Sequence, residues 1–266
     1  MAAAETPRWG SDPVDLDEHS LPALKMRFLL DHTPDHGHLL EVGSGDGKIL
    51  RTFARQRPNL VLHGCDVREW PDRDPTIDFR RLTGKDLPYA DRSIDAVVIV
   101  DVLEHVDDPE HLVAELARVL APGGRFVAFV PLEGEPRSAY ALYRRIFGAD
   151  LYARTKEHMH AFTFAQVERL LAPAFDVVHL EHAYHPLGQM MDATFFAAAL
   201  LPRLQQFWWR ENRYYAPANE QRGPLAGALN RLLELGNAIA YGESRLFARW
   251  RLGAAAVLFE AHRRGA

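Results

Sequence analysis

The chain is short of cysteine, of positive charge and of long apolar runs, and each shortage narrows what it can be. Its 266 residues include one cysteine, Cys65, so no intramolecular disulfide can form and packing must stabilise the fold. The net charge is −5, so no global basic field favours nucleic acid or an anionic membrane. The longest apolar run, Ala193 to Leu201, is shorter than the roughly 18 residues that suggest a membrane span.

Residues 1–20 are polar and acidic and contain no apolar core of a signal peptide, so we expect a cytoplasmic protein. A hydrophobic share of 47% in a chain of this length is typical of one large soluble domain, or of one domain with an extension. Repeats and low-complexity segments are lacking as well.

Apolar strands and amphipathic helices alternate along the first two thirds of the chain. The clearest strand is Ile94 to Val100, whose unbroken β-branched content is typical of a central parallel strand covered on both faces. This alternation predicts an α/β fold with a doubly wound, mostly parallel sheet and right-handed crossovers. Strands are expected at 38–42, 60–64, 77–80, 94–100, 125–130 and 175–180, and helices at 21–32, 48–57, 108–120 and 163–171.

A glycine-rich turn follows the first expected strand, with the spacing G-x-G-x-G at Gly43, Gly45 and Gly47. Glycines allow a tight turn and let a ligand lie against bare backbone, and the next helix offers free N–H groups to an anionic group. The spacing differs from the G-x-G-x-x-G of dinucleotide-binding proteins. Asp66, at the end of the second strand, is placed to hold a ribose diol. Loop and acid together predict a nucleoside site.

The segment from His38 to Pro131 resembles class I S-adenosylmethionine (SAM)-dependent methyltransferases of the small-molecule type, within them the quinone and natural-product group. The matching segments run in order, as LLEVGSGDGKIL, HGCDV and KDLPYADRSIDAVVIVDVLEHVDDPEHLVAELARVLAPGGRFVAFVP. The loop HMHAFT at 158–163 is similar as well. The resemblance implies a Rossmann-like sheet of seven strands and SAM as the cofactor.

The resemblance also implies roles for particular residues. The glycine turn would pass the methionine end of SAM, Glu41 would face its amino group, and Asp101 would border the same moiety. Asp66 would take both ribose hydroxyls with Val67 against adenine. Many members carry an acid where this chain has Thr83, which departs from the adenine-contact pattern. The residues predicted to bind the cofactor are therefore Glu41, Gly43, Ser44, Gly45, Gly47, Asp66, Val67, Gly84, Lys85, Asp86 and Asp101.

The resembled fold ends with an antiparallel seventh strand close after the sixth, yet residues 186–252 intervene here and look helical. We interpret Ala255 to Glu260 as that strand, displaced along the chain, although its alanines would also suit a terminal helix. The chain then divides into a lead-in and cap helix (1–35), a SAM-binding core (36–185), a helical lid or insert (186–252) and the last strand (253–266).

Methyl transfer from a sulfonium depends mostly on positioning, but a hydroxyl acceptor also has to lose its proton, which calls for a base. His105 is the first candidate because it follows the fourth strand at the carboxyl edge of the sheet, where ligands bind in such folds. His158 and His160 follow as candidates. Asp101, Glu104 and His105 also form an acid-x-x-Glu-His pattern that resembles metal-assisted members. Metal-free members share Glu-His-Val, so we predict no metal.

The acceptor is expected to be a small molecule, apolar or ring-containing, that is methylated on oxygen. After the fourth strand stands Val100-Asp-Val-Leu rather than the Asn-Pro-Pro-Tyr type of pattern of enzymes acting on exocyclic amino groups. Two alternatives stay open, a nicotinamide-dependent oxidoreductase and a SAM-binding protein without methyl transfer. The aromatic residues of the insert are read as its core, as a lid or as a homodimer contact: Phe195, Phe196, Trp208, Trp209, Tyr214 and Tyr215.

Overall fold

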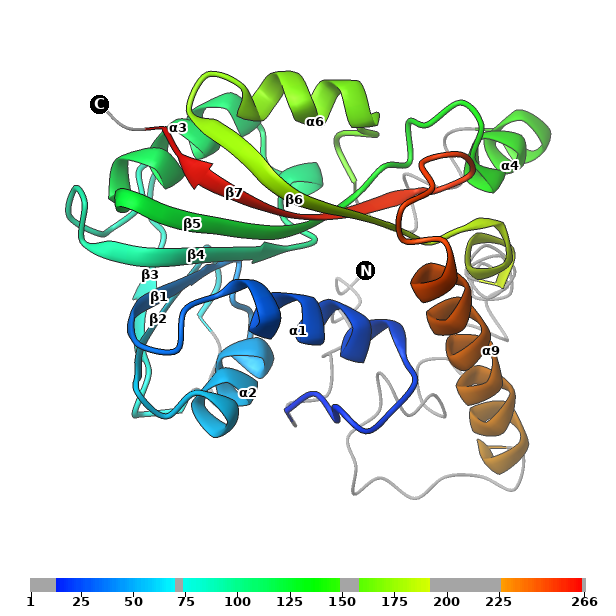
Figure 1. Cartoon of the computed structure of the whole chain (residues 1–266), viewed down its shortest axis with the longest axis horizontal. Helices are drawn as coiled ribbons and strands as arrows, with labels where there is room; N and C mark the ends of the chain where they lie inside the picture. The colour runs from blue at the N-terminus through cyan, green and yellow to red at the C-terminus, as the bar shows by residue number, and fades with distance from the viewer. Residues whose placement is uncertain (1–12, 70–73, 149–157, 192–225, 265–266) are drawn as a thin grey trace, which may run out of the picture.

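The computed structural model describes residues 13–69, 74–148, 158–191 and 226–264. They form a seven-stranded sheet in the order β3-β2-β1-β4-β5-β7-β6, in which only β7 runs against the other strands (Figure 1). This confirms the predicted α/β fold with a mostly parallel sheet. The strands are β1 (Gly37–Val42), β2 (Leu60–Asp66), β3 (Asp78–Arg81), β4 (Ile94–Val100), β5 (Leu120–Pro131), β6 (Phe175–Ala183) and β7 (Ala256–Arg263).

Helices cover both faces of the sheet, and β4 shows how the sequence allows this. Ala96 and Val98 face one apolar cluster with α1 and α2, while Val97 and Ile99 face the other with α3 and α6 (Figure 1). A strand buried on both faces needs no polar alternation, in agreement with its continuous β-branched sequence. The described helices are α1 (Leu21–His32), α2 (Lys48–Gln56), η1 (Leu103–His105, one 3₁₀ turn), α3 (Pro109–Val119), α4 (Ala139–Phe147), α6 (Phe164–Leu171) and α9 (Ala226–Leu246).

Two helix starts follow the sequence signals. The Asp108 side chain caps α3 by accepting a hydrogen bond from the backbone N–H of His111, and Pro109 occupies the first turn. Thr163 and Gln166 form a capping box at the start of α6, where a helix was expected. Helix α4, which begins after Ser138, was not predicted.

The boundary between α3 and β5 differs from the prediction. The helix was expected to include Leu120 and the strand to begin at Arg125, but α3 ends at Val119 and β5 begins at Leu120. Leu120 pairs with Ile94 ahead of a register irregularity, and Gly123 in the loop-like part of the strand has a positive φ. Leu120 is fully buried, and an apolar residue that is buried in either element does not reveal where the helix ends.

The displaced last strand is confirmed. β7 pairs antiparallel with β5, with Pro131 opposite Ala256, and antiparallel with β6, with Phe175 opposite Arg263. β7 therefore lies between β5 and β6, although both precede it in the sequence. The alternative that these residues form a terminal helix is wrong.

The insert between β6 and β7 is helical at both described ends, at residues 186–191 and in α9. Within α9, Leu233 is buried and the neighbouring Leu232 is 55% exposed. Consecutive helical residues point about 100° apart, which explains the difference. The six aromatic residues considered as core, lid or contact lie outside the described residues. Within the described part of the chain, no helix is long and apolar enough to cross a membrane.

Phe259 tests the structural importance of β7. Its side chain is 1% exposed and lies edge-on to Phe126, with ring centroids 5.3 Å apart. Phe259→Ala should lower the free energy of unfolding by about 3–5 kcal/mol, because it opens a cavity in the apolar core beside β7, the strand that pairs with both β5 and β6. Chemical denaturation measures this, and Val178→Ala on the exposed side of β6 should stay within about 0.5 kcal/mol. Similar small effects of both changes would contradict the central place of β7.

Candidate functional site: a glycine turn with buried carboxyl groups nearby

The glycine turn between β1 and α2 needs glycine for reasons of space. Gly43 has φ +73°, and a Cβ built on it would lie 2.6 Å from Cγ2 of Val102. Gly47 has φ +87°, and its Cβ would lie 2.8 Å from Cζ of Phe79. Both the backbone conformation and the close neighbours exclude a side chain, so the turn is fixed against the ends of neighbouring strands.

Asp66 is joined directly to this turn. Its Oδ2 accepts a hydrogen bond of 2.8 Å from the Gly45 N–H, and its Oδ1 accepts one of 2.9 Å from the Arg68 N–H. The Gly43 N–H also donates to the Cys65 carbonyl, at 2.9 Å. Turn and acid thus form one unit at the carboxyl edge of β1 and β2. Val67 follows with 60% of its surface exposed, which suits a residue against a flat ring.

Glu41 lies on β1 below the turn and is buried, with no hydrogen bond to its Oε2. Burial raises its pKa well above the usual value, and the nearby Asp46 and Asp66 add to the effect. A positively charged ligand group beside it would offset this cost.

The turn predicted to reach the adenine edge is tied to α3. Lys85 Nζ lies 3.4 Å from Asp108 Oδ2, and Asp86 Oδ1 lies 2.9 Å from His111 Nε2. Gly84 is exposed, and no atom lies within 4 Å of a Cβ built on it. Both charged side chains of this turn are therefore engaged at the N-terminus of α3, and the backbone at Gly84 is the open part.

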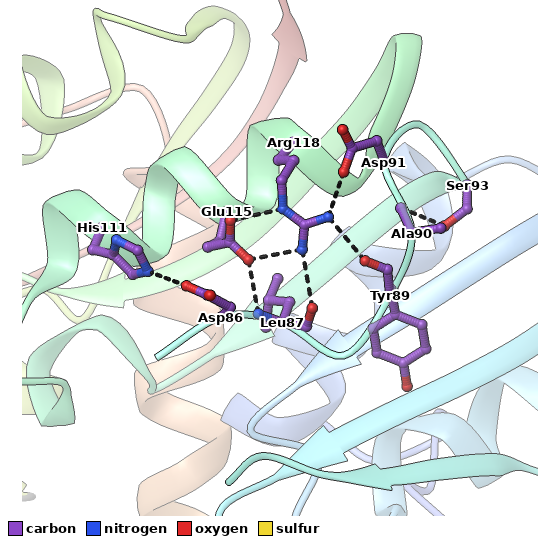
Figure 2. A network of polar contacts seen from close by, with 9 residues as sticks. All are labelled: Asp86, Leu87, Tyr89, Ala90, Asp91, Ser93, His111, Glu115 and Arg118. Carbon is purple, nitrogen blue, oxygen red and sulfur yellow. Dashed lines mark hydrogen bonds and ion pairs between the residues drawn. The ribbon is translucent and has the colours of Figure 1, made fainter. Parts of the chain in front are cut away.

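Arg118 holds the following loop in place (Figure 2). Its guanidinium donates to both oxygens of Glu115, at 2.7 and 2.8 Å, and to the carbonyls of Leu87 and Tyr89. Glu115 in turn accepts from the Leu87 N–H at 2.8 Å, and the hydrogen bond from Arg118 lowers its pKa. One possible metal-ligand atom each of Glu115, Asp86 and His111 lies within 4.8 Å of the others. The Glu115 oxygens, however, already accept hydrogen bonds from Arg118 and Leu87.

Asp101 stands just past β4 with a positive φ of 53°. Its Oδ2 pairs with Lys25 Nζ at 2.5 Å, and that ammonium lies 3.6 Å from the centroid of the Phe129 ring. Lys25 comes from α1, so the cap helix contributes a cation to the edge of the crevice. Sequence reasoning missed this lysine, because 76 positions separate the two partners.

His105 and His158 meet beside this edge. Their rings are edge-on with centroids 4.7 Å apart, and one ligand atom each from Glu104, His105 and His158 lies within 4.8 Å of the others. His158 Nδ1 is 2.9 Å from Glu133 Oε1, and His158 Nε2 is 3.9 Å from Glu104 Oε1. The first pair is close, but its angles do not form a hydrogen bond. The structure thus brings two of the three candidate histidines together, with Glu133 as an unpredicted neighbour.

Glu104 is the most unusual group of the site. Its side chain is fully buried and neither carboxylate oxygen accepts a hydrogen bond. Burial raises its pKa well above the usual value, and the Asp101 carboxylate raises it further. A buried carboxyl that lacks well-formed hydrogen bonds is costly, and such groups concentrate at functional sites. Glu104 is part of the acid-x-x-Glu-His pattern seen in the sequence, but the spacing of apolar residues did not show that its side chain is buried.

His160, the third candidate, is placed differently. Its Nε2 donates to the Val106 carbonyl at 2.9 Å, and its ring stacks on Phe162 with centroids 5.5 Å apart. The backbone N–H groups of Met159 and His160 both donate to the Glu104 carbonyl. His160 therefore fastens the loop that carries His158 to η1.

Comparisons with known proteins bear on the family and the fold. Residues 40–128 match a family model described as a methyltransferase domain. This match over part of the chain and the strand order agree with the resemblance to class I SAM-dependent methyltransferases found in the sequence. The enzyme class and the SAM cofactor predicted for the chain agree with the same comparisons.

Among curated proteins, the chain is similar to quinone-pathway methyltransferases. It is 29% identical over 141 residues to a ubiquinone biosynthesis O-methyltransferase of Hahella chejuensis, covering 49% of this chain and 58% of the relative. It is 35% identical over 117 residues to a demethylmenaquinone methyltransferase of Tropheryma whipplei, covering 41% and 47%. The chain thus spans about half the length of the curated relatives it matches.

Among solved structures, the chain resembles the [4+2]-cyclase SpnF, with a TM-score of 0.55 and 18% identity over 99% of this chain and 88% of the other. It resembles geranyl diphosphate C-methyltransferase from Streptomyces coelicolor A3(2), with a TM-score of 0.51 and 16% identity over 92% and 81%. At these identities the likeness shows the fold alone.

The Arg118 network generates a stability prediction. Arg118→Met leaves the buried Glu115 carboxylate and two carbonyls without their donor, so the free energy of unfolding should fall by about 2 kcal/mol. Chemical denaturation measures the change. Arg169→Met on the exposed face of α6 is the control and should alter stability by less than about 0.5 kcal/mol. Equal stability of the two variants would show that the network is dispensable.

Proposed function

We propose that the protein transfers the methyl group of SAM to a small-molecule acceptor. The observation that carries this proposal is the hydrogen bond from Gly45 to Asp66, which joins the glycine turn to the acid on the next strand. An acid held there keeps lone pairs for a ribose diol, while the turn offers bare backbone beside it.

The residues of the crevice suit the parts of SAM. The space above Gly45, where an added Cβ meets nothing within 4 Å, would admit the methionine end. Buried Glu41, with one oxygen unsatisfied, would receive the amino group, and Asp101 would border the same moiety. Val67 would lie against adenine with Gly84, Lys85 and Asp86 at its edge. The bound sulfonium supplies an activated methyl group and a good leaving group.

We propose oxygen as the accepting atom and an in-line displacement as the reaction. The chain then has to hold the acceptor oxygen roughly 3 Å from the methyl carbon and remove its proton. His105 is exposed at the carboxyl edge of the sheet, and we propose it as the base. We propose that His158, which lies beside Glu133, takes the proton onward. His160 has its Nε2 committed to a carbonyl, so it ranks last among the three.

An apolar or ring-containing acceptor is the class that the relatives support, since two of them are named for ubiquinone and menaquinone biosynthesis. The predicted helical lid at 186–252, the remaining domain boundaries, a homodimer and a cytoplasmic location stay predictions.

A SAM-binding protein without methyl transfer is the main alternative, and a neighbour of the same fold is described as a [4+2]-cyclase. Isotopically labelled SAM with quinol-like acceptors separates the two, because only a methyltransferase moves the label. The nicotinamide-dependent oxidoreductase is disfavoured by the G-x-G-x-G spacing.

A metal-assisted reaction is a second candidate, because Glu104, His105 and His158 converge. Carboxylate oxygens and imidazole nitrogens are ligands for divalent first-row metals, and the unsatisfied Glu104 carboxylate fits such a group. These three residues would hold the ion, which would supply Lewis-acid polarisation of the acceptor oxygen.

Asp66→Ala tests the cofactor site. Loss of the charged hydrogen-bond acceptor should weaken SAM binding by about 1.5–3 kcal/mol, measured by calorimetry. Asp35→Ala removes an exposed carboxylate that pairs only with Arg57 among the described contacts, and it should leave the affinity unchanged. Unchanged SAM affinity in Asp66→Ala would refute the cofactor assignment.

His105→Ala tests the base. Turnover should fall about 10²-fold or more while SAM binding holds. His36→Ala, at an exposed position before β1, should keep normal turnover. Near-normal turnover in His105→Ala would remove the role from His105. A chelator added to the wild-type enzyme separates the two candidates, since activity that survives it excludes metal assistance.

A further inference from the structure

A surface that combines apolar and basic residues lies between α9 and β7. Leu246, Trp250 and Leu252 are 76%, 62% and 66% exposed. Arg245 and Arg249, next to Leu246 and Trp250 in the sequence, are exposed as well. We call residues 245–252 the basic apolar segment. Large apolar side chains gathered at the surface mark interaction sites more often than scattered ones do.

The segment is built into the fold. The fully buried side chain of Gln189 accepts a hydrogen bond from the Ala139 N–H at 2.6 Å and donates one to the Gly253 carbonyl at 2.6 Å. His185 Nε2 donates to the Trp250 carbonyl at 2.9 Å. These bonds tie the segment to α4 and to residues 186–191, which lie on the same side of the molecule in Figure 1.

The basic apolar segment is positively charged, whereas the whole chain has a negative net charge. Between Ser244 and Phe259 the sequence has three arginines and no acidic residue, although the net charge is −5. The nearest preceding acid, Glu243, accepts hydrogen bonds from the N–H groups of Leu187 and Gly188. Arg251 lies 3.5 Å from Glu135, so Arg245 and Arg249 carry the outward charge.

The neighbouring helix α4 has the same character. Leu142 and Ile146 are exposed there, with Arg145 between them in the sequence. Leu187, on the turn held by Gln189, is exposed as well. Apolar and cationic side chains thus extend over three adjoining segments.

We infer that the basic apolar segment is a docking surface for an anionic lipid bilayer. Tryptophan favours the boundary between headgroups and acyl chains, where its ring is apolar and its N–H stays wet. Arginines pair with lipid phosphates while their stems lie on apolar surface. If the segments of two copies packed against each other, arginines would face arginines and repel. The positive charge of the segment therefore favours an anionic lipid surface over self-association.

The place of the segment in the fold gives this surface a use. Ala256 pairs with Pro131, so the segment lies at the carboxyl edge of the sheet, on the side of the crevice. If the proposed function holds, docking turns the crevice toward the membrane, from which an apolar acceptor could enter. The lipid binding itself does not depend on that function.

Co-sedimentation of the full chain with vesicles tests the inference. Vesicles of phosphatidylglycerol and phosphatidylcholine should bind the protein, pure phosphatidylcholine should bind it at least tenfold more weakly, and added salt should weaken the binding. Arg249→Glu with Trp250→Ser should reduce binding at least tenfold. Arg55→Glu with Val61→Ser, an exposed pair on α2 and β2, is the matched control and should bind as the wild type does.

Thermal unfolding and SAM affinity, measured on each variant, show whether the fold is intact and keep failure of docking distinct from failure of the proposed function. Leu246→Glu, a single change at a 76% exposed position, serves if the double variant does not fold. The inference is overturned if the wild type does not bind anionic vesicles, or if the control loses binding equally. It is also overturned if the variants abolish a dimer in sedimentation while vesicle binding is absent.

Discussion

The close approach of Gly43 to Val102 is the constraint on which the crevice depends. A Cβ at this position would lie 2.6 Å from the valine, and the positive φ excludes most side chains independently. The same residue donates its N–H to Cys65, so the ends of β1, β2 and β4 converge on one backbone position. From that position the chain turns to place Gly45 against Asp66. The nucleoside-type geometry is therefore a consequence of how three strands end together.

Two buried carboxyl groups flank this junction, and both are raised in pKa by burial. Glu41 lies below the turn and Glu104 lies beyond β4, and in both at least one oxygen lacks a hydrogen bond. The fold tolerates this cost at two positions along one crevice. Ligands that bring positive charge or hydrogen-bond donors would relieve it, which is the physical reason for placing the cofactor amino group at one and proton or metal chemistry near the other.

Much of the fold could be predicted from the sequence because the relevant signals are local. The β-branched run of β4, the caps at Asp108 and Thr163 and the glycine turn each depend on residues within a few positions. The late strand β7 was found because a resembled fold required a partner for β5 and β6. The start of β5 was misplaced, since Leu120 is buried whichever element contains it. Helix α4 was missed altogether.

The site was less accessible to sequence reasoning. Periodicity cannot show that Lys25 of α1 reaches Asp101, or that Glu133 lies beside His158, because these contacts form only when distant elements pack. The burial of Glu104 is likewise a property of packing, although its acid-x-x-Glu-His pattern drew attention to it. The six aromatic residues considered as core, lid or contact lie outside the described residues, so the acceptor side is a prediction.

Calorimetric titration of the purified chain with SAM, with its demethylated product and with NAD tests the central claim most directly. The account predicts one-to-one binding of SAM and of its product, and no binding of NAD, because the turn has the G-x-G-x-G spacing and Asp66 is bonded to Gly45. Binding of NAD without binding of SAM would contradict it.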